Sequence, residues 1–257
     1  MGSIHVAGPD IYPMDSSIED AFAQADSLVV EVDITKVDEE RSVQLIVEHG
    51  LYPQGKTLQN GLPEELYAQL AEQFAQLGSD IATLDMFRPW VVSVILEQLQ
   101  LEEFGYLPEY GIDLHFLNKA AETDKDIIEL ETADFQSVLI ASFPDELMIL
   151  LLKENAKNPL SQDEATQLFS VWEDGDSAEM EAILFEALIE EPALTPFYEK
   201  MIDERNFNMA EQIEEFFTDD ETYFVVVGAG HLVGENGLIN ILDERGYVIE
   251  QLHDSDQ

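Results

Sequence analysis

The feature that most constrains the fold is a short apolar run near the C-terminus, residues 223–227 (YFVVV), which glycines close at once. The run is aromatic and β-branched and is too short for a helix of its own, so it predicts a buried strand. His231 follows at the carboxyl end of this strand, inside the pattern G-x-x-H at residues 228–231. Residues 2–5 repeat this pattern and end in His5. We therefore expect two histidines, far apart in the sequence, to be presented alike.

Two further short runs predict strands that end in carboxylates. Residues 27–33 (SLVVEVD) carry Glu31 and Asp33, which share one face because strand side chains alternate, and residues 127–131 (IIELE) end in Glu131. A carboxylate within an apolar run is costly unless a cation or a donor meets it. Glu31 is therefore either a structural charge paired with an arginine or backbone amides, or a group that faces a metal or a reacting atom.

A predicted long helix, residues 196–217, supplies a cation for these carboxylates. It carries Arg205 and Asn206 near its middle. In so acidic a chain an arginine is expected to pair with carboxylates, and Glu31 and Glu131 are the buried candidates.

The charge of the chain excludes some classes of partner. The 257 residues include 55 acidic and 11 basic ones, for a net charge of −44. Nucleic acid is excluded as a partner because its binding needs a Lys/Arg patch. The acidity is typical of a solvated surface, with a sink for divalent cations or a docking face for a basic partner as alternatives.

Cysteine is absent, which excludes a disulfide and a thiolate metal site. No apolar stretch reaches the ~20 residues of a membrane span, and no N-terminal export signal is present. The first G-x-x-H pattern starts at residue 2 with almost no strand before it. We expect that an upstream strand, together with an export signal, preceded it.

The pattern of elements predicts a single α/β domain over residues 1–257, with a central, mainly parallel sheet flanked by helices. Residues 144–195 are helical and acidic and predict a helical insertion or lid, and residues 247–252 predict a final edge strand. His253, in the acidic tail, is expected to have no role. Residues 50–57 (GLYPQGKT) match a phosphate-binding loop by letter, but a predicted helix precedes them where that loop needs a strand.

Other polar residues gain interest from their places beside these strands. The predicted helix from residue 111 to 125 carries Asp113 and His115, which matter only if its start lies against the strand ends. Gln136 lies in a helix that Thr132 is expected to cap.

These placements predict a site at one edge of the sheet. In an open α/β sheet, ligands bind beyond the carboxyl ends of the strands. Two neutral imidazoles, His5 and His231, and the carboxylate of Glu31 make a three-ligand metal site of the type that activates water.

Several segments together resemble the TraB/GumN (PrgY, Tiki) family over nearly the whole chain. The matching segments are GSIHVAGPDIYP, LVVEVD, RPWVVSVIL, EYGIDLHFLNKA, ELET, ERNFNMA and VVVGAGHLVGENGL. The resemblance implies an α/β core related to the erythromycin esterase and ChaN group. It also implies an active site formed by His5, His231 and Glu31, since Tiki members similar in these motifs act as metal-dependent proteases, whereas bacterial members are linked to peptide pheromones or polysaccharide genes.

The preferred hypothesis is a metal-dependent hydrolase, with a peptidase acting on a peptide or protein substrate as the favoured type. A divalent ion (Mn, Co or Zn) held by His5, His231 and Glu31 would supply hydroxide, and Arg205 or a backbone amide near Gly228 would steady the oxyanion. The supporting residues are expected to be Asp33, Asp113, His115, Glu131, Gln136, Asn206 and Gly228. The alternative is a binding protein that sequesters a peptide, haem or another small ligand in the same crevice. The sequence leaves the oligomeric state open, and the resemblance is compatible with an extracytoplasmic protein.

Overall fold

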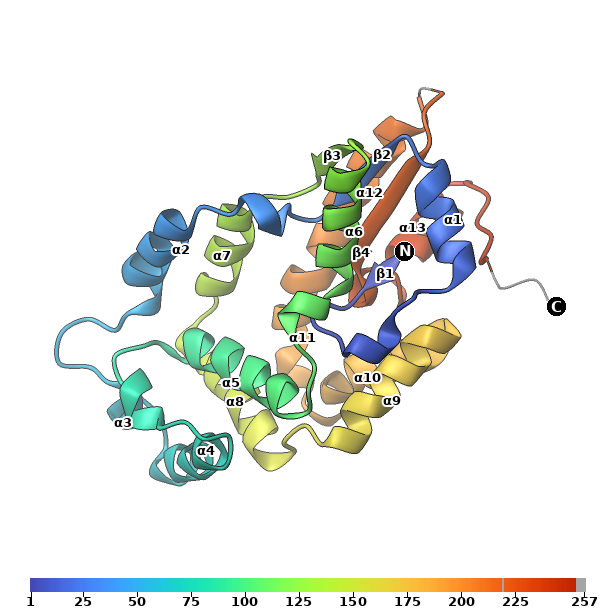
Figure 1. The fold of residues 1–257 in the computed structure, drawn as a ribbon. Helices are drawn as coiled ribbons and strands as arrows, with labels where there is room; N and C mark the ends of the chain where they lie inside the picture. Colours follow the sequence, from blue (N-terminus) through green and yellow to red (C-terminus); the bar gives the residue numbers. More distant parts are fainter. Residues whose placement is uncertain (219, 253–257) are drawn as a thin grey trace.

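A parallel β-sheet forms the centre of the computed structural model, which describes residues 1–218 and 220–252 (Figure 1). Within the described residues the sheet has four strands in the order β1-β4-β2-β3. These are β1 (Gly2–Ser3), β2 (Ser27–Val30), β3 (Asp126–Glu129) and β4 (Tyr223–Gly228). The predicted α/β fold with a parallel sheet and flanking helices is confirmed.

The strand register brings four distant segments to one edge of the sheet. Strand β4 pairs in parallel with β1, with Gly2 opposite Val227, and with β2, with Ser27 opposite Tyr223. Strand β3 pairs in parallel with β2 on the other side. Because all strands run the same way, the residues that follow them lie at the same edge.

Helices cover both faces of the sheet and form two apolar clusters with it. On one face α1 (Ser16–Gln24) and α6 (Ile112–Glu122) pack Phe22 and Phe116 against Phe224. On the other face α12 (Glu204–Phe216) and α13 (Leu238–Glu244) pack Met209 and Leu238 against β2 and β4. The alternation of side chains along the strands sends neighbouring valines to opposite clusters, so both faces of the sheet are buried.

The start of α6 lies tightly against the first G-x-x-H turn. The Ile112 N–H donates to the carbonyl oxygen of Ile4 at 3.1 Å. A Cβ at Gly111 would lie 2.3 Å from the carbonyl oxygen of His5, so only glycine fits here. This contact brings the first turn of α6 to the strand ends.

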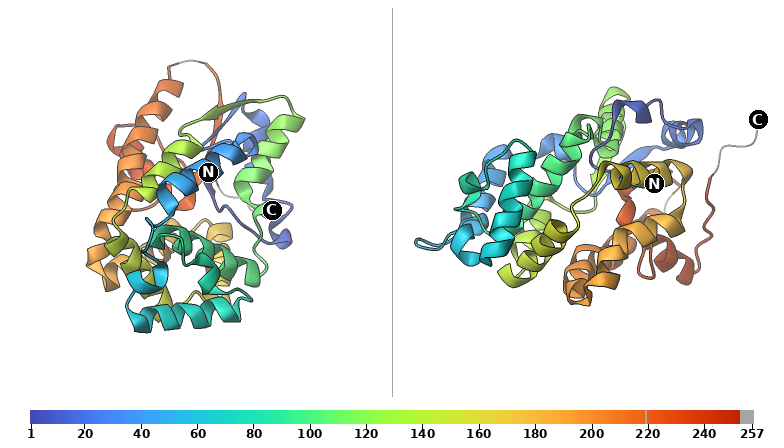
Figure 2. Two further views of the ribbon diagram at one scale, coloured as in Figure 1. Left: turned by 90° about the vertical axis from the view of Figure 1, so that its left-hand side faces the viewer. Right: turned by 90° about the horizontal axis from the view of Figure 1, so that it is seen from below.

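The helical part of the molecule is larger than the predicted insertion. Residues 144–195 contain α8 (Asp145–Lys157), α9 (Gln162–Asp174), α10 (Ser177–Glu190) and the start of α11 (Thr195–Tyr198). Helix α8 packs through Leu152 against Leu70 of α4 (Glu64–Gln76) and Leu96 of α5 (Pro89–Glu103). Figure 2 shows the helices of residues 58–103 to one side of the molecule, away from the strands. The remaining α-helices of the described residues are α2 (Glu39–Leu45), α3 (Leu58–Gly61) and α7 (Ala133–Ala141).

Two sequence expectations concern segments outside the sheet. The GLYPQGKT segment follows a π-helix, Ile46–Gly50, and leads into the short α3, which Thr57 caps, so it does not follow a strand. The expected edge strand at residues 247–252 was wrong, because the described residues give this segment no strand partner. His253 lies outside the described residues.

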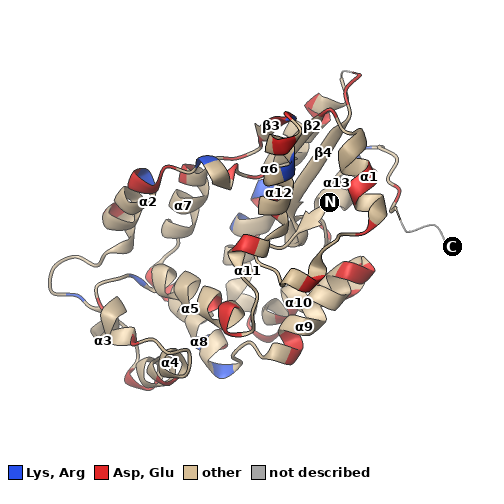
Figure 3. Ribbon diagram, viewed as in Figure 1, with Lys and Arg blue, Asp and Glu red and all other residues tan. Residues whose placement is uncertain are grey.

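Acidic residues occur on most helices (Figure 3). In the part of the chain that the structure describes, no single helix combines the length and the apolar character needed to cross a bilayer. Helices α7 and α8 reach those limits only as a pair bent by 90°.

Asp145 ties the helical region together and gives a first prediction. Its carboxylate pairs with Lys56 at 3.0 Å and with Arg88 at 2.9 Å. Burial alone would raise its pKa, but these two cations hold the pKa below its usual range. Asp145→Asn is expected to lower the free energy of unfolding by about 2 kcal/mol at pH 7, because two charge-assisted hydrogen bonds are lost. Urea unfolding would measure this loss.

The pH dependence follows from the direction of the shift. A lowered folded-state pKa stabilises the fold above the unfolded value of about 4, and this stabilisation is lost as the pH falls through the folded-state value. The difference between the wild type and Asp145→Asn should therefore shrink on acidification. Exposed Asp243→Asn is the control and should change little. An Asp145 effect that stays constant from pH 7 to acid would contradict the role of the ion pairs.

Candidate functional site

A buried arginine joins the carboxylates that follow β2 and β3. Arg205, on α12, lies 2.5 Å from Glu31 and 2.8 Å from Glu131 through Nη2. Its Nε–H also donates to Glu131 Oε1 at 2.9 Å, and Nη1 donates to the carbonyl oxygen of Met201. All three charged side chains are less than 10% exposed. The ion pairing predicted from the sequence is confirmed.

Two further donors fix the Glu31 carboxylate. Gln136, on α7, donates its amide to Glu31 Oε2 at 3.0 Å and to Glu131 Oε2 at 2.9 Å. The Gly228 N–H donates to Glu31 Oε1 at 2.6 Å, and a Cβ at this glycine would lie 3.2 Å from the same oxygen. The glycine therefore allows the carboxylate to approach the end of β4.

His231 lies beside Glu31 and is held from behind by an asparagine. Its Nδ1 is 2.6 Å from Asn206 Oδ1, and Asn206 Nδ2 donates to the Asn236 carbonyl oxygen at 2.7 Å. Because the asparagine nitrogen is committed as a donor, its oxygen accepts and Nδ1 of His231 carries the proton. The lone pair is then on Nε2, which lies 3.7 Å from Glu31 Oε1.

His5 is held through the same ring nitrogen but by a carboxylate. Its Nδ1 is 2.8 Å from Asp113 Oδ2, in the first turn of α6. The Ser3 hydroxyl donates to the other carboxylate oxygen at 2.6 Å, so Asp113 is oriented from two sides. The His5 side chain is 72% exposed, and its Nε2 is the ring nitrogen left for other contacts.

The different surroundings of the two histidines shift their pKa values in opposite directions. The hydrogen bond to Asp113 raises the pKa of His5 to about 9. Burial lowers the pKa of His231 to about 4. Burial by itself would raise the pKa of Glu31, but the positive charge of Arg205 and the hydrogen bond from the Gly228 N–H hold it below its usual range. At neutral pH the site therefore contains a carboxylate beside a neutral imidazole, with a protonated imidazole on a neighbouring strand end.

The residues fit a metal ion in part. Two donors on one ion, each at about 2.1 Å, can be up to about 4.2 Å apart, so His231 Nε2 and Glu31 Oε1 at 3.7 Å are compatible with a shared cation. The Nδ1 contacts to Asn206 and Asp113 are of the kind that orients metal-binding histidines. Among residues 1–218 and 220–252, however, no group of three or more His, Cys, Asp or Glu side chains is arranged to hold an ion.

Two residues expected to support the site make their contacts elsewhere. The His115 ring lies against the Tyr12 ring, with centroids 4.6 Å apart and planes tilted by 30°, and its Nε2 lies 3.4 Å from Glu19 Oε1. Asp33 is buried, but its carboxylate holds Thr35 and Lys36. Both side chains hold local structure around the strands.

Sequence reasoning missed Ser3 and Asn236. Ser3 lies inside the first G-x-x-H pattern, and Asn236 lies five residues after His231. A signal was available for Ser3, because a hydroxyl on a two-residue buried strand needs an acceptor. None was available for Asn236, whose backbone carbonyl carries the contact.

A family model described as the TraB/PrgY/gumN family matches residues 1–251. The chain belongs to this family. It is 24% identical over 242 residues to the protein YbaP of Escherichia coli (strain K12), a match that covers 94% of this chain and 86% of YbaP. YbaP of Shigella flexneri matches to the same extent. No solved structure matches.

The buried arginine of this TraB/PrgY/gumN chain gives a second prediction. Arg205→Met leaves Glu31 and Glu131 without their cation in a dry interior, so the free energy of unfolding should fall by about 3–5 kcal/mol. Adding Glu131→Gln should recover part of this loss, because one carboxylate is then neutral. Urea unfolding at pH 7 would measure both variants.

Arg245→Met is the matched control, because Arg245 pairs with Glu214 in a more exposed setting, with side chains 29% and 30% exposed. A pair of this kind contributes about 0–1 kcal/mol. Equal losses in Arg205→Met and Arg245→Met would contradict the central role of the buried arginine.

The carboxylate behind His5 gives a third prediction. Asp113→Asn removes the negative charge at Nδ1, so the pKa of His5 should fall from about 9 toward the ordinary value near 6.5. NMR titration of the imidazole carbons would measure it. The pKa of His231 should change little, since its Nδ1 contact is with Asn206. A pKa of His5 that stays near 9 would show that another group controls it.

Proposed function

We propose that this protein is a metal-dependent hydrolase whose site lies at the carboxyl edge of the sheet. The observation that carries the proposal is the pair formed by His231 Nε2 and Glu31 Oε1, 3.7 Å apart and both buried. A neutral imidazole and an ionised carboxylate, each fixed from behind, are ready ligands for a divalent cation.

His231 and Glu31 would hold the ion, with His5 as the third ligand. A bound Mn, Co or Zn ion would polarise a substrate carbonyl and lower the pKa of water. His5 would ligate through Nε2 of its neutral ring, so the Nε2 proton of the imidazolium would be released to solvent while Nδ1 keeps its proton and its hydrogen bond to Asp113.

The other residues of the site position these ligands. Arg205 and Gln136 hold Glu31 Oε2 and leave Oε1 directed toward His231. Asn206 fixes the tautomer that presents Nε2 of His231. The guanidinium and the Gly228 N–H already bond Glu31, so in this proposal they orient the carboxylate and do not steady an oxyanion.

The proposed substrate is a peptide or protein. This part of the proposal comes from the resemblance of the G-x-x-H motifs and the strand glutamate to the Tiki proteases. The largely exposed His5 beside buried His231 supports a site that a chain substrate can reach from one side.

A second candidate function is non-enzymatic binding of a peptide, haem or another small ligand in the same place. The observation in its favour is that Arg205 already neutralises Glu31 and that three metal donors do not converge within the described residues. In a binding protein the two histidines would contact the ligand without turnover.

Metal content and turnover separate the two functions and give a fourth prediction. The wild type, His5→Ala and His231→Ala would be equilibrated with manganese, cobalt or zinc, freed of loosely bound ions and measured by inductively coupled plasma mass spectrometry. About one retained ion per chain is expected in the wild type and a loss in both variants, because each removes a ligand. Cleavage of a peptide library should require the ion and disappear in His231→Ala.

His49→Ala is the control, since this histidine lies on the π-helix after α2 and its side chain is 43% exposed. It should keep the ion and the turnover. Equal metal content in all four proteins would contradict the proposal of a metal-dependent hydrolase. Ligand binding that weakens in His231→Ala while no peptide is ever cleaved would favour the binding protein.

A further inference from the structure

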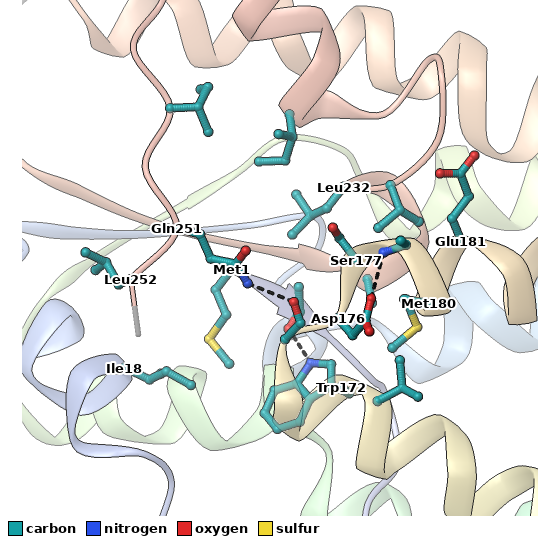
Figure 4. Close-up of a pocket in the computed structure, with 18 of the residues that line it drawn as sticks. Met1, Ile18, Trp172, Asp176, Ser177, Met180, Glu181, Leu232, Gln251 and Leu252 are labelled. Atoms are coloured by element: carbon teal, nitrogen blue, oxygen red, sulfur yellow. Dashed lines mark hydrogen bonds between the residues drawn. The ribbon is translucent and has the colours of Figure 1, made fainter. Parts of the chain in front are cut away.

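A cavity lies behind the two G-x-x-H turns. It has a volume of about 600 Å³ and is bounded by α1, the first turn of α10, the start of α13 and the segment 249–252 (Figure 4). Gly2, Ala229 and Leu232 contribute to its wall. These residues belong to the turns or adjoin them, so the cavity lies against the same turns that carry His5 and His231.

The wall is apolar and the rim is acidic. Ile18, Trp172, Met180 and Leu232 line the cavity, and the carboxylates of Asp176, Glu181 and Glu250 also belong to its lining. No lysine or arginine is among the lining residues. A ligand that complements this surface has apolar groups and a positive charge, because rim carboxylates attract cations and repel anions.

The segment that borders the cavity has the sequence of a strand but no strand partner in the described structure. Residues 247–252 read YVIEQL, and Val248 and Leu252 are 96% and 65% exposed. One hydrogen bond, from Gln251 Nε2 to the Gly175 carbonyl oxygen at 2.8 Å, fastens it across the cavity. A segment that has strand-forming residues but no strand partner can serve as a template for pairing with an extended chain.

We propose that this cavity binds a short, extended peptide segment in which apolar residues alternate with basic ones. The peptide backbone pairs with residues 247–252, its apolar side chains enter the cavity beside Trp172, and its basic side chains face Glu181 and Glu250. Strand addition of this kind takes affinity from main-chain hydrogen bonds and specificity from alternate side chains. The volume is within the ~300–1,000 Å³ of small-ligand sites.

One hydrogen bond connects the cavity lining to the first G-x-x-H turn. Trp172 Nε1 donates to the Gly2 carbonyl oxygen at 2.9 Å, three residues before His5. Because Trp172 lines the cavity, the fluorescence of its indole should change when a peptide binds. The proposal goes beyond the hydrolase function and does not depend on it.

The test uses the peptide acetyl-Leu-Arg-Val-Lys-Ile-amide and the variant Trp90→Phe, which leaves Trp172 as the single tryptophan. Binding would be followed by Trp172 fluorescence and by calorimetry at low salt. We expect the peptide to bind at least tenfold more tightly than acetyl-Leu-Glu-Val-Glu-Ile-amide. Binding should also weaken as salt is added, because exposed charges are screened.

Three variants locate the site. Ala178→Trp places a bulky ring at an exposed position of the lining, the pair Glu181→Gln and Glu250→Gln removes rim charge, and truncation after Tyr247 removes the pairing segment. Each should weaken binding at least fivefold while the circular dichroism spectrum is retained. His49→Ala, on the π-helix Ile46–Gly50 and outside the cavity lining, should bind as the parent does.

The proposal is overturned if the acidic peptide binds equally well, or if Ala178→Trp and the truncated chain both bind as the parent does. A lack of detectable binding at peptide concentrations up to about 1 mM, a dissociation constant typical of a weak complex, would also overturn it. It is also overturned if the parent forms a dimer in sedimentation that Ala178→Trp abolishes, since a second copy of the chain would then occupy the cavity.

Discussion

The contact of Arg205 with Glu31 and Glu131 is the interaction on which the rest of the site depends. The three groups are less than 10% exposed and come from α12 and the ends of β2 and β3. Charges in so dry a place are tolerated only as a matched set, because each unpaired ion carries a penalty of several kcal/mol. The set therefore fixes the position of α12 against the sheet, and with it Asn206 and the tautomer of His231. One guanidinium thus sets the geometry of residues that it does not touch.

The two histidines show how the same motif can give different chemistry. Both end a G-x-x-H turn and both are held through Nδ1, but the partner is a carboxylate for His5 and an amide for His231. A carboxylate favours the imidazolium, whereas an amide oxygen in a buried place leaves the ring neutral. The site therefore combines a group that carries a proton with a group that carries a lone pair. A single divalent ion bound by both histidines would need both rings to be neutral, each with a free lone pair.

The sequence was sufficient for the parts of the structure that rest on local pattern and charge balance. The runs around Val29 and Val225 predicted parallel strands, and the shortage of basic residues predicted the partners of Arg205. It was insufficient where contacts join distant segments without a pattern, as for Ser3 and Asp113, which are 110 residues apart. The strand predicted at residues 247–252 was wrong for a different reason. Its composition favours a strand, but strand formation also requires a partner edge, and composition says nothing about that edge.

The strongly negative charge of the chain places the same demand on both proposed binding events. A net charge of −44 attracts cations to every face of the molecule, so attraction alone selects neither a metal ion nor a basic peptide. Selection has to come from geometry in a low-dielectric setting. At the sheet edge this is the fixed 3.7 Å pair of His231 and Glu31, shielded from solvent. At the proposed peptide site it is an apolar wall beside acidic residues, which an extended chain with alternating apolar and basic side chains complements. The cavity lining includes Gly2 and Ala229 of the two turns, which pack so closely that a Cβ at Gly2 would lie 3.0 Å from the Cα of Ala229. Because such close packing resists local shifts, the two proposed sites share one rigid wall formed by these turns.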